Sequence, residues 1–170
     1  HKKTRHYTKT YWPYLPLLLI VGLGIAVNTL WGNTQQVLGY ATNINASSLL
    51  AETNTARQEN GQSNLKYNDK LSHAAQLKAN DMATRGYWSH NTPDKKSPWT
   101  FIVGVGYTYR AAGENLAYGF DNSPDTLEAW MDSPGHRANI LNDAYKEVGF
   151  GIAHSPDYQK SGPETIIVAM

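Results

Sequence analysis

The stretch AWMDSPGHRANILN, from Ala129 to Asn142, interrupts one helical pattern and starts another within three residues. Pro134 and Gly135 favour the end of the first helix, because proline disfavours helical backbone at the residue before it and is accepted in a first helical turn. His136 then stands at the start of the second, shorter helix. A histidine at a helix start beside a glycine is open to approach by other groups. The fold and the function therefore depend on which residues elsewhere in the chain face His136.

The rest of the C-terminal two thirds divides into helices followed by strands. Capping residues and apolar spacing predict helices over residues 47–61, 68–86 and 123–131, the last with Ser123 as N-cap and Pro124 in its first turn. Residues 147–154 and 164–170 alternate apolar residues with glycine or are rich in β-branched residues, which predicts strands. Helices first and strands last indicate an α+β fold rather than a regular βαβ alternation.

Two further segments carry residues that could work with His136. GYWSHNTPD places His90 just after the second predicted helix, and AAGENLAYG places Glu114 ahead of an apolar stretch. A carboxylate flanked by two imidazoles can perform general acid–base chemistry, and the imidazoles can hold a divalent metal. The purely structural alternative is that Glu114 and His90 only cap or support turns.

Together, SH at 89–90, GENLAYG at 113–119 and AWMDSPGHRANILN at 129–142 resemble the CAP superfamily, in the form found in bacteria. This superfamily of SCP-like extracellular domains includes cysteine-rich secretory proteins, antigen 5 and pathogenesis-related 1 proteins. The resemblance covers residues 48–170. It implies a three-layer α-β-α sandwich around a central, largely antiparallel sheet, with an open cleft lined by two histidines and two glutamates.

Three of these four cleft positions match the resemblance. His90 corresponds to the first histidine, Glu114 to the first glutamate and His136 to the last histidine. The position of the second glutamate is Ser133 in this chain, and the nearby acids Glu128 and Asp132 are out of register. A mechanism that needs two carboxylates is therefore in doubt.

Other polar and aromatic residues have plainer interpretations. We expect Arg137 to pair with an acidic residue, His154 to lie in a loop after a strand, and His73 to be solvated. Trp88, Trp99 and Trp130 are predicted to be core residues.

The N-terminal part differs in character, since no residue between Lys9 and Glu52 carries a formal charge. Residues 11–31 are predicted to form a transmembrane anchor, because they are long and apolar enough and carry aromatic residues at both ends. The basic residues all precede this segment, which predicts a cytoplasmic tail over 1–10 and a linker over 32–47. The alternatives are a signal peptide cleaved near GIA at 24–26, which would release a secreted domain, or a buried core helix.

Composition excludes several classes of function. The chain has 170 residues and no cysteine, so neither disulfides nor thiolate metal sites are available. From Trp31 onward it carries eleven basic and fourteen acidic residues, which gives no reason to expect a nucleic-acid partner.

The predicted function is that of a membrane-anchored extracytoplasmic binding module, whose cleft takes a lipid, a peptide or another cell-surface ligand, or a divalent metal. His90 and His136 are the predicted metal ligands, for Zn²⁺ or another divalent cation bound weakly, and no other cofactor is implied. One alternative is a peptidase-like hydrolase with His90, Glu114 and His136 as catalytic residues. The other is a structural surface domain with a vestigial cleft. The resemblance favours binding over catalysis.

Overall fold

The structure is a computed structural model that describes residues 42–170. The predicted cytoplasmic tail, the transmembrane anchor and residues 32–41 of the linker lie outside the described residues. Within the described part, no helix is long and apolar enough to cross a membrane.

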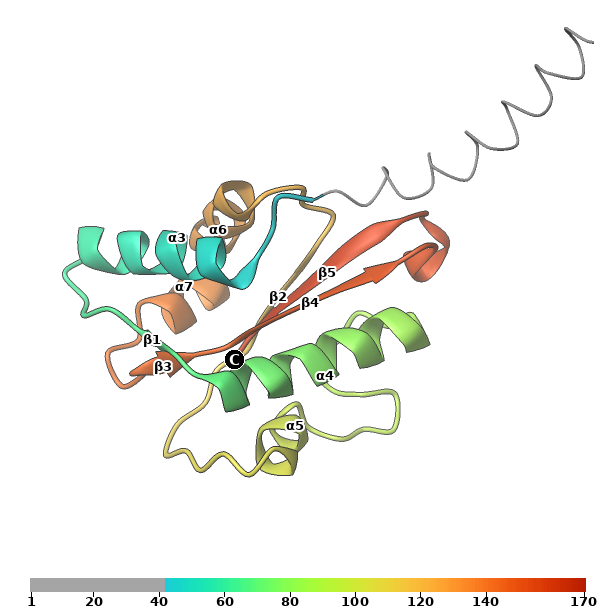
Figure 1. Ribbon diagram of the computed structural model, residues 1–170, viewed down its shortest axis with the longest axis horizontal. Helices are drawn as coiled ribbons and strands as arrows, with labels where there is room; N and C mark the ends of the chain where they lie inside the picture. Colours follow the sequence, from blue (N-terminus) through green and yellow to red (C-terminus); the bar gives the residue numbers. More distant parts are fainter. Residues whose placement is uncertain (1–41) are drawn as a thin grey trace, which may run out of the picture. The chain divides into compact units, whose positions relative to one another are not determined.

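Helices predominate in the first two thirds of the described chain and strands at its end, with short strands between some of the helices (Figure 1). The helices are α3 (Ala46–Glu59), α4 (Asp69–Arg85), α5 (Trp99–Gly104), α6 (Ser123–Asp132) and α7 (Pro134–Ile140). The strands are β1 (Lys66–Tyr67), β2 (Asn115–Tyr118), β3 (Glu147–Val148), β4 (Phe150–Ser155) and β5 (Glu164–Ala169), with a short 3₁₀ turn, η2 (Tyr158–Lys160), between the last two.

Side-chain caps start the three longer helices. Asn68 caps α4 by accepting hydrogen bonds from two backbone amides, and Gly86 ends the helix in the left-handed conformation at φ +63°. The helix therefore occupies the predicted range 68–86 to within one residue at each end. The cap of α6 is Asn122 and not the predicted Ser123, which is instead buried against Ser48 of α3. Asn45 caps α3, so this helix starts at Ala46, two residues before the predicted domain start at Ser48.

Three strands form an antiparallel sheet in the order β2-β5-β4. The central strand, β5, follows both of its neighbours in the sequence. It pairs with β4 over its whole length and with β2 over Ile166–Ala169, with Ile167 opposite Ala117 on one side and Ile152 on the other. A separate pair of very short strands, β1 and β3, is parallel. The mixed α and β composition and the antiparallel sheet agree with the sequence-based prediction.

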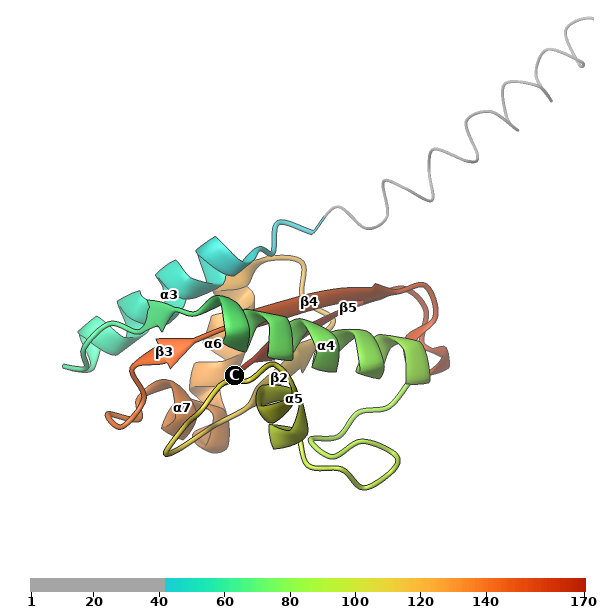
Figure 2. The same ribbon diagram turned by 60° about the horizontal axis from the view of Figure 1, so that its bottom comes forward.

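Helices cover both faces of the sheet, and each face has its own apolar core. Alternate residues of the central strand point to opposite faces, so Ile166 and Val168 pack with the α4 and α5 side while Ile167 packs with the α3, α6 and α7 side. Figure 1 shows α4 and α5 on one side of the strands, and the turned view in Figure 2 shows α5 beneath α4. The predicted apolar face of α4 is buried in the first of these cores.

The backbone of β4 lies directly against the backbone of α4. A Cβ atom added to Gly151 would stand 2.2 Å from the carbonyl carbon of Ala75, and one added to Gly149 would stand 2.0 Å from the amide nitrogen of Ser72. The alternation of glycine with apolar residues in this strand therefore reflects close helix–sheet contact, which only glycine permits.

Two of the plainer interpretations from the sequence are wrong. Trp88 is 41% exposed and packs edge-on against Tyr118 at the surface, while Trp130 is buried as predicted. His154 lies inside β4, where its Nδ1 is 3.1 Å from Oγ1 of Thr165, and not in a loop. Trp88 follows the end of α4 on a loop, and β4 continues to Ser155, one residue past His154. A short sequence window shows neither the path of a loop nor the exact end of a strand.

Candidate functional site

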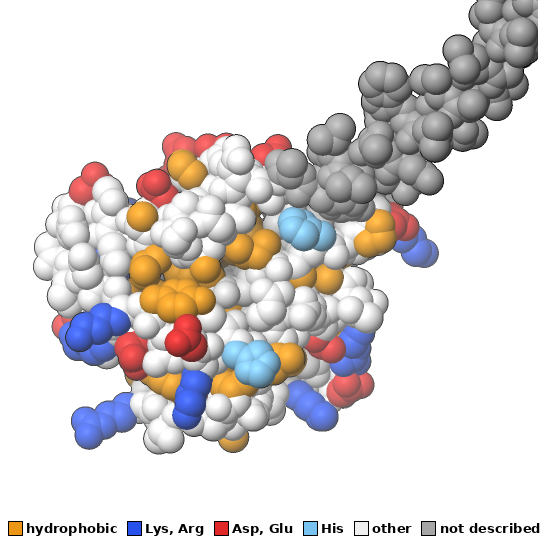
Figure 3. All heavy atoms as spheres, in the orientation of Figure 1, with side chains coloured by type: hydrophobic (Ala, Val, Ile, Leu, Met, Phe, Trp, Pro, Cys, Tyr) orange, Lys and Arg blue, Asp and Glu red, His pale blue; other side chains and the backbone are white. Residues whose placement is uncertain are grey.

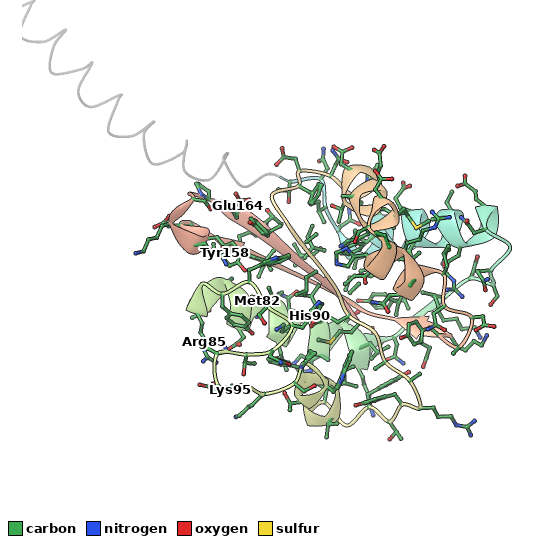
Figure 4. All side chains as sticks on the ribbon, turned by 180° about the vertical axis from the view of Figure 1, so that it is seen from behind. Met82, Arg85, His90, Lys95, Tyr158 and Glu164 are labelled. Atoms are coloured by element: carbon green, nitrogen blue, oxygen red, sulfur yellow. The ribbon has the colours of Figure 1, made fainter. Side chains whose placement is uncertain are left out.

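The three predicted site residues line one open cleft of about 480 Å³. His90 lies on the loop that leaves α4, as labelled in Figure 4, Glu114 immediately precedes β2, and His136 lies in the first turn of α7. Pro98 and Trp99, at the start of α5, form part of the same wall. The fold thus brings together residues that are separated by up to 46 positions in the sequence.

A short hydrogen bond joins His90 to Glu114. The distance between His90 Nδ1 and Glu114 Oε1 is 2.6 Å, and the imidazole is 59% exposed whereas the carboxylate is only 1% exposed. An ionised carboxylate can only accept hydrogen bonds, so the proton of a neutral His90 resides on Nδ1 and the lone pair on Nε2. With Glu114 ionised, this hydrogen bond selects the tautomer and holds the direction of the ring.

Burial dominates the electrostatics of Glu114. Desolvation raises the pKa of its carboxyl, while the hydrogen bond from His90 and the positive charge of Lys78 act in the opposite direction. Its second oxygen, Oε2, has no hydrogen-bond partner among the described residues. A buried acceptor of this kind is costly unless a ligand, an ion or water pairs with it.

His136 stands across the cleft in a half-buried position. Burial lowers the pKa of its imidazole, and the nearby charge of His90 acts in the same direction. Both effects favour neutral imidazole, which is the form that binds metal ions and accepts protons. The Pro134-Gly135 break therefore does what the sequence suggested, since it lets α7 start beside the cleft.

Two asparagines that sequence reasoning missed connect the cleft walls. Asn139 Nδ2 donates to the carbonyl oxygen of Glu114 at 3.1 Å and to Oδ1 of Asn115 at 2.9 Å, and Asn115 Nδ2 donates to the carbonyl oxygen of His136 at 3.1 Å. These bonds hold α7 against the start of β2. Both asparagines stand inside the quoted motifs, but asparagine is so common in turns that the motifs alone gave no reason to choose them.

The cleft contains a single carboxylate among the residues that line it. Ser133, at the position of the family's second glutamate, lines the cleft, whereas Glu128 and Asp132 are exposed on α6 and do not line it. Arg137, which we expected to pair with an acid, instead donates from Nη2 to Oδ1 of Asn60 at 2.8 Å. Within residues 42–170, no group of three or more histidine, aspartate or glutamate side chains is arranged to hold a metal ion.

A second cavity of about 470 Å³ adjoins this cleft and shares Ala112, Gly113 and Asn139 with it. Its lining is mainly apolar and includes Trp130 and Phe150. On the face of the molecule drawn in Figure 3, acidic and basic side chains lie interspersed among the described residues.

Comparison with curated proteins finds two relatives in Bacillus subtilis. The chain is 38% identical over 103 residues to the uncharacterized protein YkwD, and 30% identical over 104 residues to the uncharacterized membrane protein YlbC. Each match covers 61% of this chain but only 40% and 30% of the respective relative, so the chain spans less than half of either protein.

Solved structures have the same fold. An extracellular protein containing an SCP domain from Bacillus anthracis superposes with a TM-score of 0.63 at 24% identity, over 75% of this chain and 40% of that one. A cysteine-rich secretory protein from Staphylococcus aureus superposes with a TM-score of 0.57 at 27% identity, over 73% of this chain and 37% of that one. Residues 50–170 match the family described as CAP, the cysteine-rich secretory protein family. Because this match covers well over half of its residues, the chain belongs to the CAP family.

Proposed function

We propose that the domain is an extracytoplasmic binding module whose cleft takes a divalent cation weakly through His90 and His136. The observation that carries this proposal is the 2.6 Å hydrogen bond from His90 Nδ1 to the buried carboxylate of Glu114. Metal-binding histidines usually donate their other ring N–H to a carboxylate or carbonyl, which orients the ring and raises its basicity. His90 has this support, and His136 lines the same cleft with a lowered pKa.

The donor set suits an ion such as Zn²⁺ but does not complete its coordination. Imidazole is a good zinc ligand, and structural zinc sites use four protein ligands. Here the near oxygen of Glu114 already accepts from His90, so two imidazoles remain and water would fill the other positions. The affinity should be modest and the ion unnecessary for folding. A bound Zn²⁺ would supply a Lewis acid and lower the pKa of bound water.

Zinc titration followed by calorimetry tests this proposal. We expect heat of binding for the natural protein, no detectable binding for His136→Ala, and little change in the unfolding temperature of the variant, because the imidazole is half exposed and contributes little packing. His73→Ala is the matched control, since His73 is an exposed histidine of α4 outside the cleft. Equal heats for the natural protein and His136→Ala would contradict the proposal.

A hydrolase is the second candidate, and the same hydrogen bond favours it. A buried carboxylate that holds the Nδ1–H of an exposed histidine is also the arrangement of a general base. Such a base would act on water or on a substrate group, in which case His136 would be the second proton carrier. Should zinc not bind, this reading and an organic ligand that extends into the adjoining apolar cavity become the leading alternatives.

We further propose that residues 11–31 anchor the domain on the outer side of a membrane. The long uncharged and apolar run, with every basic residue of this region before it, supports this orientation. The related protein YlbC is named a membrane protein, and the Bacillus anthracis structure is that of an extracellular protein.

Protease treatment of intact cells that make the full chain tests the orientation. We expect loss of the domain after residue 31 while a cytoplasmic marker protein stays whole, because only the outer face is accessible. A domain that survives until the cells are lysed would contradict the proposal. Sequencing the mature N-terminus distinguishes anchoring from release, since a start near Val27 would indicate cleavage and secretion.

A further inference from the structure

Lys78 is a fully buried lysine in the middle of α4. Its ammonium group donates three hydrogen bonds, to the carbonyl oxygen of Ser89 at 2.9 Å, to the carbonyl oxygen of His90 at 2.6 Å and to the hydroxyl of Tyr87 at 3.2 Å. These use the full donor capacity of the group. Lysine is rarely buried unless its charge is compensated, so its position beneath the cleft needs an explanation.

Glu114 provides the larger opposite charge, and Asp81 adds a smaller one. The carboxylate of Glu114 is buried beside the same loop and attracts the ammonium of Lys78, against the desolvation that both groups undergo. Lys78 therefore holds the backbone of His90 while Glu114 holds its imidazole. The two buried charges fix this residue from both sides.

The other contacts of the loop that carries His90 lie at its first two residues. The carbonyl oxygen of Tyr87 accepts from the hydroxyl of Tyr158, the hydroxyl of Tyr87 donates to Asp81, and the ring of Trp88 packs against Tyr118. Residues 87–91 form no helix or strand, and the imidazole of His90 is 59% exposed, so packing alone does not orient it. The ammonium of Lys78 binds two consecutive carbonyls of this loop, at Ser89 and His90. Loss of these bonds would remove two backbone contacts between residues 89–90 and α4, next to the His90–Glu114 pair.

We propose that Lys78 is a positioning residue for His90. It acts through its hydrogen bonds to the backbone of residues 89–90 and through its attraction to the charge of Glu114. This inference rests on the proposed role of His90 in the cleft. Lys78 does not touch the cleft surface itself, since it is buried and is not among the lining residues.

The tautomer of His90 in metal-free protein gives a direct test. Long-range ¹H–¹⁵N spectra at a pH where neutral imidazole dominates should show the proton of His90 on Nδ1 in the natural protein. In Lys78→Met we expect this signal to be lost or mixed with the other tautomer, because the ring no longer meets an ionised Glu114 at a fixed distance. An unchanged His90 signal with a lowered unfolding temperature would show that Lys78 is only structural and would overturn the proposal.

A matched control and a second variant complete the experiment. Lys70→Met alters an exposed lysine of the same helix, whose Nζ donates to the carbonyl oxygen of Gly106, and should leave the His90 signal unchanged. If Lys78→Met fails to fold, the same spectra are recorded for Lys78→Gln. The glutamine amide can still donate to one of the two carbonyls but carries no charge, so this variant should fold while the His90 Nδ1–H signal is again lost or mixed. All spectra are recorded without metal, so failure of zinc binding would leave this result intact.

The charge component has its own measurement. If the buried Lys78 and Glu114 charges compensate each other, Glu114→Gln should lower the unfolding temperature less in a Lys78→Gln background than in the natural protein. If Glu114→Gln lowers the unfolding temperature equally in both backgrounds, Lys78 does not act through the charge of Glu114, and that part of the proposal is wrong.

Discussion

Gly151→Ala is expected to abolish the native fold or to lower the free energy of unfolding by more than about 4 kcal/mol, which is exceptional for one added methyl group. The new Cβ would lie 2.2 Å from the carbonyl carbon and 2.3 Å from the carbonyl oxygen of Ala75. Both atoms belong to the backbone of α4, so no side-chain rotation relieves the overlap. The helix would have to move away from β4, and the core that includes Ala75, Ala79 and Met82 would open.

Urea unfolding followed by circular dichroism measures this loss, with Gly104→Ala as the matched control. Gly104 ends α5, and a Cβ there would meet no atom within 4 Å. The same chemical change should thus be neutral, or stabilising by up to about 1 kcal/mol through helix propensity. A Gly151→Ala protein as stable as the control would mean that α4 and β4 are not in the close contact described above.

Arg57→Met is expected to lower the free energy of unfolding by about 2–4 kcal/mol, a large part of the roughly 5–15 kcal/mol that holds a domain of this size together. Arg57 of α3 is fully buried and donates from Nη1 to the carbonyl oxygens of Ile140 and Asn142, and from Nε to that of Ser63. Methionine fills much of the same space but has no donor. Three backbone carbonyls would then lose their partner. The bond to Ile140 is buried, and those to Asn142 and Ser63 are partly buried. An unpaired buried acceptor costs about 1–3 kcal/mol, and a partly exposed one costs less because water can replace the partner.

The residues that lose support include the end of α7, the helix that carries His136. Arg137→Met is the matched control, because Arg137 is exposed and its bond to Asn60 lies at the surface. We expect this variant to stay within about 0.5 kcal/mol of the natural protein. Similar losses for the two variants would contradict the assignment of Arg57 as the buried support of α7.

The site residues could be predicted from sequence because the family resemblance aligned them, not because their chemistry was visible. Nothing in the spacing of His90, Glu114 and His136 shows that they share a cleft, since their contact depends on how β2 and α7 pack. Lys78 was missed for a physical reason. A lysine within an amphipathic helix is normally solvated, and only the later loop at residues 87–90 turns its position into a buried one.

The fold, too, was predictable where an element depends on neighbouring residues and not where it depends on residues far away in the sequence. Caps and apolar spacing located α3, α4 and α6 within one or two residues, as expected for signals that act over a single turn. The six-residue helix α5 was not predicted, because WTFIVG is too short to show a helical period. The strand β2 appeared only as an apolar stretch, and its partner in the sheet lies about 50 residues later in the sequence.

The position of β5 in the sheet determines the order in which the domain can assemble during synthesis. The outer strands β2 and β4 do not pair with each other. In this sheet β2 pairs with residues 166–169 and β4 with residues 164–169. Domains are made from the N-terminal end, so both outer strands leave the ribosome before the strand that joins them. The helices can form early, but neither apolar core can pack completely before β5 contributes Ile166, Ile167 and Val168. The three-stranded sheet can therefore close only after residues 164–169 have been made, whatever the helices have formed before then.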